Sequence, residues 1–65
     1  MNLPYGASEK ELGICISVLR EVTGEQEVHE LAVKILNIVY AKGGDYSEKT
    51  IRAFAEAYWK GQSAS

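Results

Sequence analysis

Apolar residues recur along this chain at the three- and four-residue spacing of an amphipathic helix. Three such runs occur, consisting of Leu12, Cys15, Ile16, Leu19 and Val22, then Val28, Leu31, Ala32, Ile35 and Val39, then Ile51, Phe54, Ala55 and Tyr58. Each run places its large side chains on one face of a helix. The pattern therefore predicts three helices that bury these faces against one another.

Capping signals give the bounds of the first two predicted helices. Ser8-Glu9-Lys10-Glu11 has the S-x-x-E form of a capping box, and Gly24 can take the left-handed conformation that ends a helix. The first helix is predicted over 9–22. Thr23-Gly24-Glu25-Gln26 has the related form T-x-x-Q, so the second helix is predicted to run over 24–42.

The strongest break in the chain is Gly43-Gly44, which ends the second predicted helix. Asp45 and Ser47 are both candidate caps for a third helix, predicted over 47–60 and ended by Gly61. Residues 1–7 contain proline and glycine and read as irregular. Residues 61–65 offer little to bury and are expected to fray.

Two segments rich in β-branched residues raise the alternative of strands. Ile14-Cys15-Ile16-Ser17-Val18-Leu19 and Ile35-Leu36-Asn37-Ile38-Val39-Tyr40 both lack the two-residue alternation of a half-buried strand, and both lie inside longer segments bounded by helix caps. The helical interpretation is favoured. The expected fold is an all-α three-helix bundle that forms a single domain over 1–65.

The size of the chain limits how much stability one core can supply. With 65 residues, of which 46% are hydrophobic and 25% charged, the chain is expected to fold, but its core supplies only about 3–5 kcal/mol. Cys15 is the only cysteine and cannot close an internal disulfide; Cys15 and His29 together are too few ligands for a structural zinc. No cofactor or metal is expected, which leaves association with another chain as the remaining source of stability.

The first two helices carry more apolar surface than their core faces require. Val33 and Leu36 join His29 and Tyr40 in a second stripe along the second helix. The interface predicted from this excess comprises Ile14, Val18, His29, Val33, Leu36, Tyr40 and Trp59. The alternative is that the second helix is central and that its neighbours enclose both stripes. Gly13 and Ser17 form a small-residue pair on the first helix, which we assign to its solvated side.

No catalytic constellation is apparent, so the chain is not expected to be an enzyme. Cys15 lies between Ile14 and Ile16 on the core face, where a thiol is inert. His29 is the only histidine and has no evident nucleophile to assist. If His29 lies in an interface, self-association is expected to weaken between about pH 7 and pH 5.5.

A helix-turn-helix that inserts the third helix into DNA is the alternative functional interpretation. The net charge of −2 lacks the basic excess of a nucleic-acid-binding domain. Glu48, Arg52, Glu56 and Lys60 alternate in sign at i,i+4 spacing, which is typical of a solvated, ion-paired face. Nucleic acid is therefore not the expected partner.

Location follows from the lack of sorting signals. The N-terminal residues lack the basic, apolar and small-residue pattern of a secretory signal. Polar residues such as Ser17, Arg20 and Lys34 interrupt the apolar stretches well short of the ~20 residues that a membrane helix needs. The sequence thus predicts a cytoplasmic helical module that does not contact a membrane. It is expected to form a homodimer or to dock on a larger partner protein.

Overall fold

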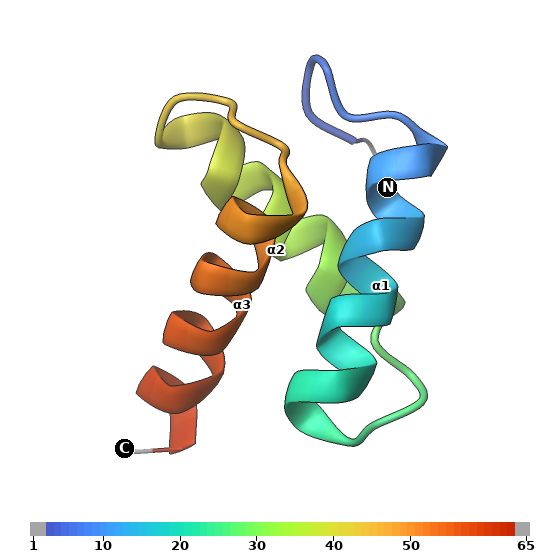
Figure 1. Ribbon diagram of the computed structural model, residues 1–65, viewed down its shortest axis with the longest axis vertical. Coiled ribbons are helices and arrows are strands. Elements are labelled where there is room, and N and C mark those ends of the chain that lie inside the picture. The colour runs from blue at the N-terminus through green and yellow to red at the C-terminus, as the bar shows by residue number, and fades with distance from the viewer. Residues whose placement is uncertain (1–2, 64–65) are drawn as a thin grey trace.

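The protein is a three-helix bundle. A computed structural model describes the backbone of residues 3–63 and the side chains of residues 3–61. The helices are α1 (Glu9–Thr23), α2 (His29–Ala41) and α3 (Glu48–Ser63), and each contacts both of the others. Figure 1 shows α1 and α3 toward the viewer, with α2 crossing diagonally behind them. The all-α prediction is confirmed over the described residues, where no strand is found.

The capping box predicted at the start of α1 is present. The carboxylate of Glu11 accepts a hydrogen bond from the backbone N–H of Ser8 at 2.9 Å and another from the Ser8 hydroxyl. These bonds lower the pKa of Glu11, because they stabilise its ionised form. The local sequence from Ser8 to Glu11 therefore determines where α1 begins.

The predicted start of α2 is wrong by five residues. Gly24 has φ of +77° and accordingly ends α1 in the left-handed conformation, with its N–H bonded to the carbonyl of Arg20. The Thr23 hydroxyl donates to the Leu19 carbonyl at 2.8 Å and accepts from the Glu25 N–H at 3.0 Å. Thr23 is thus used to close α1 and shape the turn, and α2 begins only after a loop over 24–28.

The junction between α2 and α3 follows the sequence closely. Gly43 and Gly44 both have positive φ and end α2, as predicted. Ser47 precedes α3, and its hydroxyl accepts from the Thr50 N–H at 3.4 Å; Asp45 accepts from the Ser47 N–H at 3.2 Å and from the Thr50 hydroxyl at 2.7 Å. Both candidate caps are therefore used.

The predicted end of α3 at residue 60 is too early. Gly61 lies inside the helix, which continues to Ser63, because a single glycine in the last turn weakens a helix without necessarily ending it. Of the tail expected to fray, residues 64 and 65 lie outside the described residues, as do residues 1 and 2 of the irregular N-terminal segment.

The core is built around α2. Its fully enclosed side chains come from all three helices and from the loop before α2, and they are Cys15, Val18, Leu19, Val28, Ala32, Ile35, Leu36, Val39, Ile51 and Ala55. Leu12, Ile16, Val22, Leu31, Phe54 and Tyr58 pack around them as partly buried residues. The three predicted core faces are thus confirmed as the faces that meet.

Helix α2 is enclosed on two sides, which corrects the predicted interface. Leu36 is 0% exposed, Val33 is 7% exposed and Val18 is 2% exposed. Because α1 and α3 both pack against α2, the second apolar stripe is covered within one chain at these positions. Val18, Val33 and Leu36 therefore belong to the interior, and the alternative of a central second helix is the one observed.

The N-terminal segment is fastened to the loop between α2 and α3, which lies at the same end of the bundle. The Tyr46 hydroxyl, in the loop before α3, donates to the Tyr5 carbonyl at 2.7 Å. Gly6 has φ of +89°, and the Tyr46 ring passes so close to it that an added Cβ would lie 3.1 Å from a ring carbon. The segment before α1 is thus held by one side chain 41 positions away. None of the described helices combines the length and the apolar character needed to cross a bilayer.

Leu36→Ala is expected to destabilise the single folded chain strongly, because it leaves a cavity in the core. Such substitutions cost about 2–5 kcal/mol, which is comparable to the whole expected stability. Urea denaturation followed by circular dichroism measures the loss. Tyr40→Ala on the same predicted stripe is the control and should change stability by less than about 1 kcal/mol; equal effects of the two substitutions would contradict the assignment of Leu36 to the core.

Tyr46→Phe is expected to release the N-terminal segment without unfolding the bundle. The substitution removes the hydroxyl that holds the Tyr5 carbonyl but keeps the ring that packs against Gly6. Amide hydrogen exchange should become faster at Ala7, whose N–H is bonded to the Pro4 carbonyl at 3.0 Å. Exchange at Ile35, in the middle of α2, should stay unchanged. A uniform rise at both positions would show that the bond supports the whole fold instead.

Candidate docking groove between α1 and α3

A groove lies between α1 and α3, and no residue of α2 lines it. It has a volume of about 470 Å³. Its lining consists of Gly13, Ile14, Ser17, Val18, Glu21, Glu48 and Arg52. The face of α1 that carries Cys15 is turned toward α2, since the Cys15 thiol lies 3.6 Å from the Ala32 carbonyl. The groove therefore uses a part of α1 that the core leaves open.

The floor of the groove is made of small and apolar residues. Gly13 and Ser17 lie one turn apart and are both exposed, and an added Cβ at Gly13 would meet nothing within 4 Å. Ile14 is half-buried and packs against the core on one side. Val18 is buried beneath them. A side chain or a helix from another molecule can thus approach the α1 backbone closely here.

Charged residues form the rim. Arg52 of α3 lies 2.9 Å from a carboxylate oxygen of Glu21 on α1 and 3.3 Å from one of Glu48. Both partners raise the pKa of the Arg52 guanidinium, Glu21 more than Glu48. The rim holds two carboxylates and one guanidinium, so it carries one negative charge in excess. The i,i+4 pair of Glu48 and Arg52 was predicted, whereas the bridge to Glu21 was not.

The structure brings together only two of the seven predicted interface residues. Ile14 and Val18 line the groove, with Ile14 the more accessible of the two. Val33 and Leu36 lie in the core, as described above. The predicted interface is therefore not one continuous surface.

The remaining three predicted residues are spread over the molecule. His29 is exposed at the first position of α2, Tyr40 is 50% exposed near the other end of the same helix, and Trp59 is half-buried in the last turns of α3. His29 and Tyr40 are separated by about 16 Å at 1.5 Å per residue. None of the three lines the groove, so a histidine-dependent interface gains no support from their placement.

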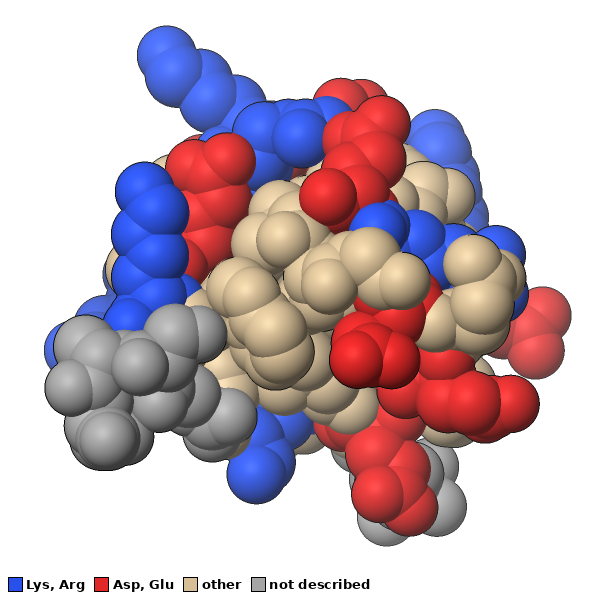
Figure 2. Space-filling view, turned by 90° about the horizontal axis from the view of Figure 1, so that it is seen from below, with Lys and Arg blue, Asp and Glu red and all other residues tan. Residues whose placement is uncertain are grey.

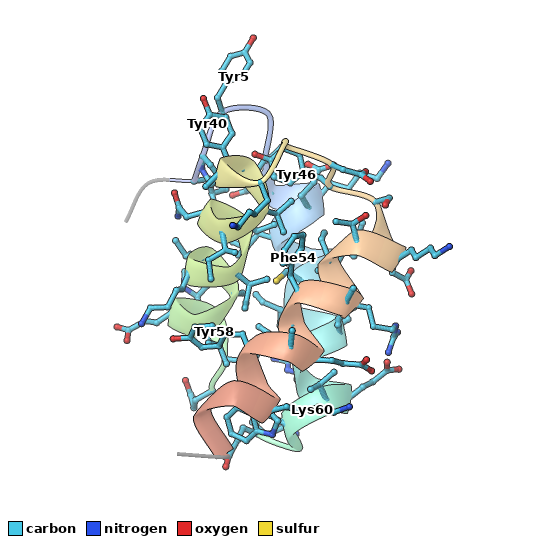
Figure 3. The ribbon with its side chains drawn as sticks, turned by 90° about the vertical axis from the view of Figure 1, so that its left-hand side faces the viewer. Tyr5, Tyr40, Tyr46, Phe54, Tyr58 and Lys60 are labelled. Atoms are coloured by element: carbon cyan, nitrogen blue, oxygen red, sulfur yellow. The ribbon has the colours of Figure 1, made fainter. Side chains whose placement is uncertain are left out.

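Tyr40 instead joins an aromatic group at the end of the bundle where α2 stops. Figure 3 shows the Tyr40 and Tyr5 rings projecting outward from this end, with Tyr46 below them. Tyr5 is 86% exposed. Desolvation raises the pKa of Tyr46, and the nearby Tyr40 and Glu11 add smaller contributions in the same direction. The arrangement fastens the N-terminal segment and presents two solvated rings.

Cys15 is an interior residue whose thiol is shielded from solvent. Its thiol is 0% exposed, and burial raises its pKa to about 12. The predicted assignment to the core is confirmed. Within residues 3–61, no polar or charged residue is buried, and no group of three or more His, Cys, Asp or Glu side chains is placed to hold a metal ion.

Five groove residues were not among the predicted interface residues: Gly13, Ser17, Glu21, Glu48 and Arg52. The spacing of Gly13 and Ser17 was noticed, but their position opposite the core face led to their assignment to solvent. One sequence signal could have identified Gly13 and Ser17. Two small residues one turn apart beside the apolar Ile14 leave room for another chain to approach the helix. The position of Glu21 beside Arg52 depends on how α1 and α3 cross, which periodicity does not encode.

Comparison with known proteins leaves the groove to be interpreted from its own geometry. No family model, no curated protein sequence and no solved structure matches this chain.

The buried thiol predicts a specific dependence of stability on pH. The thiol of Cys15 has a pKa of about 12 in the folded chain, whereas an exposed thiol ionises near pH 8.5–9. Its contribution to stability is therefore fully present below about pH 8.5. Above that pH the unfolded chain alone loses the proton, and the free energy of unfolding falls by up to about 1.4 kcal/mol per pH unit.

Urea denaturation from about pH 7 to about pH 10 measures this effect. Cys15→Ala is the control, because it retains every other titrating group while removing the thiol. The difference in unfolding free energy between the wild type and Cys15→Ala should be constant below about pH 8.5 and should shrink above it. Parallel profiles over the whole range would contradict a buried, neutral thiol.

Proposed function

We propose that this protein is a non-catalytic helical interaction module that binds another protein chain in the groove between α1 and α3. The observation that carries the proposal is the open floor at Gly13 and Ser17, beside the partly exposed Ile14. The bound chain is either a second copy or a larger partner. The proposal keeps the cytoplasmic location expected from the sequence.

The shape of the groove favours a helix as the bound element. Small residues one turn apart let a helix approach the α1 backbone closely, and helix-in-groove binding is a common mode of recognition. The α1 side of the floor supplies apolar contact at Ile14. The charged rim favours a partner with a basic group, because Glu21 and Glu48 exceed Arg52 in charge and rim charges mainly govern specificity and association rate.

The DNA-binding alternative gains no specific support. Arg52 would be a central basic contact of α3, but it is engaged by two carboxylates. Figure 2 shows the molecule from below, with an uncharged area in the middle that Lys and Arg side chains border mainly at the left and above and Asp and Glu side chains mainly at the lower right. Acidic groups also lie between the basic ones along the upper edge. A phosphate backbone would require a broader and uninterrupted basic face.

Site-specific photo-crosslinking tests the proposed docking surface. A benzophenone amino acid placed at Ser17 should form covalent adducts with a protein chain when the full-length protein is irradiated in its native cells. The same group at Lys49, which is exposed in the first turn of α3 and does not line the groove, is the control. Mass spectrometry identifies the second chain in each adduct.

Adducts at Ser17 but not at Lys49 would support the groove as a protein-binding site. Equal yields at both positions, or none at Ser17, would refute it. Circular dichroism of each variant must show the helical spectrum of the wild type, so that a loss of crosslinking is not due to unfolding.

A further inference from the structure

We infer that the groove binds α1 of a second copy of this chain, with the two α1 helices antiparallel about a twofold axis beside Cys15 and Ile16. This inference rests on the proposed function and names its partner. It follows from the charges at the two ends of the exposed α1 face and from the residue sizes between them.

Four residues define that face. Lys10, Gly13, Ser17 and Glu21 follow one another at intervals of three, four and four positions, so they form a stripe along one side of α1. Lys10 and Glu21 lie at opposite ends of the stripe, about 16 Å apart at 1.5 Å per residue. The small residues occupy its centre. The stripe is thus positive at one end and negative at the other.

Such a stripe is complementary to itself only when the second copy runs in the opposite direction. Pairing about the midpoint of α1 places Lys10 of each copy opposite Glu21 of the other, and twofold symmetry makes this contact occur twice. Parallel pairing would put like charges together at both ends. The charge pattern therefore specifies the direction.

The same pattern specifies the register. Moving the axis by two residues toward the N-terminus of α1 would place Lys10 opposite Ser17 and would leave Glu21 beyond the start of the partner helix, without a cation to face. In the favoured register Ile14 of one copy faces Ser17 of the other. The large apolar side chain of each copy then enters the part of the groove where its partner has a small residue.

The groups required for this contact are available. Lys10 is exposed and forms no ion pair among the described residues. The Glu21 side chain is 64% exposed, and Arg52 contacts one of its two carboxylate oxygens. The excess negative charge of the rim therefore remains for a lysine from outside. A single pair of 15-residue helices forms a small contact, so the dimer is expected to be weak and to dissociate on dilution.

Sedimentation equilibrium of the purified full-length protein tests the inference. The wild type should show a monomer–dimer equilibrium at low salt, over concentrations from about 10 µM to about 1 mM. Lys10→Glu and Glu21→Lys should each weaken dimerisation about tenfold or more, because each places like charges at both symmetric contacts. The double variant Lys10→Glu/Glu21→Lys restores opposite charges at both symmetric contacts and should recover part of the affinity, because it also removes the bridge from Arg52 to Glu21.

Two further variants keep the test independent of folding. Lys49→Glu makes the same charge change outside the groove and should leave the dimer unchanged. Ser17→Trp fills the centre of the stripe and should abolish the dimer, with an unaltered helical spectrum. Loss of dimer in both single variants with recovery in the double variant would establish the antiparallel contact.

Other outcomes overturn the inference in distinguishable ways. A wild type that remains monomeric at the highest concentration, while Ser17 crosslinks to a different protein, removes the second copy but retains the docking groove. A dimer that tolerates Ser17→Trp uses another surface and also refutes the inference. A monomer with no adduct at Ser17 refutes both proposals.

Discussion

The structure depends on the enclosure of α2 between α1 and α3. Ile35 and Leu36 are successive residues of α2, point in directions about 100° apart, and are both 0% exposed. Such neighbours can both be buried only if the helix has a partner on each side. Ile51 and Ala55 supply this from α3, and Cys15 and Leu19 from α1. Removing either α1 or α3 would expose part of the apolar surface that α2 buries.

This arrangement also explains why the groove lies where it does. Helices α1 and α3 contact each other as well as α2. One side of each helix is therefore buried in the core, and the other side faces solvent. Along α1 the boundary of the core runs through Ile14 and Val18, and the next residues outward are Gly13 and Ser17. Larger residues at these two positions would cover the boundary. Their small size leaves it open, and the bridge from Arg52 to Glu21 joins α1 and α3 across the opening.

Local signals predicted the fold well because they act within a few residues. The box at Ser8 and Glu11, the glycines at 43 and 44 and the caps at Asp45 and Ser47 each formed as the sequence indicated. The start of α2 could not be predicted in the same way. Thr23 can cap either the helix before it or the helix after it. Because Gly24 takes the left-handed conformation, Thr23 is used at the end of α1.

The site was less predictable because its residues are assembled by packing. Counting apolar side chains showed that α2 carries two apolar stripes. Whether the second stripe is exposed to solvent depends on where the neighbouring helices lie. That decision placed Val33 and Leu36 in the core and left Tyr40 half exposed at the helix end. The groove depends likewise on the angle between α1 and α3. The apolar period of a single helix shows neither the angle at which it crosses another helix nor which helices pack against it.

The small core and the open groove are connected through stability. A chain of this length gains little beyond a few kcal/mol from its own interior, and any partner that binds only the folded state adds RT ln(1 + [L]/Kd) to it. A partner bound in the groove would add this stabilisation across the contact between α1 and α3. The ion pairs of Arg52 in that contact are exposed, so water screens them. Covering them would lower the local dielectric and strengthen the bridge from Arg52 to Glu21. Binding in the groove would thus reinforce the contact that shapes the groove, so that docking and folding support each other.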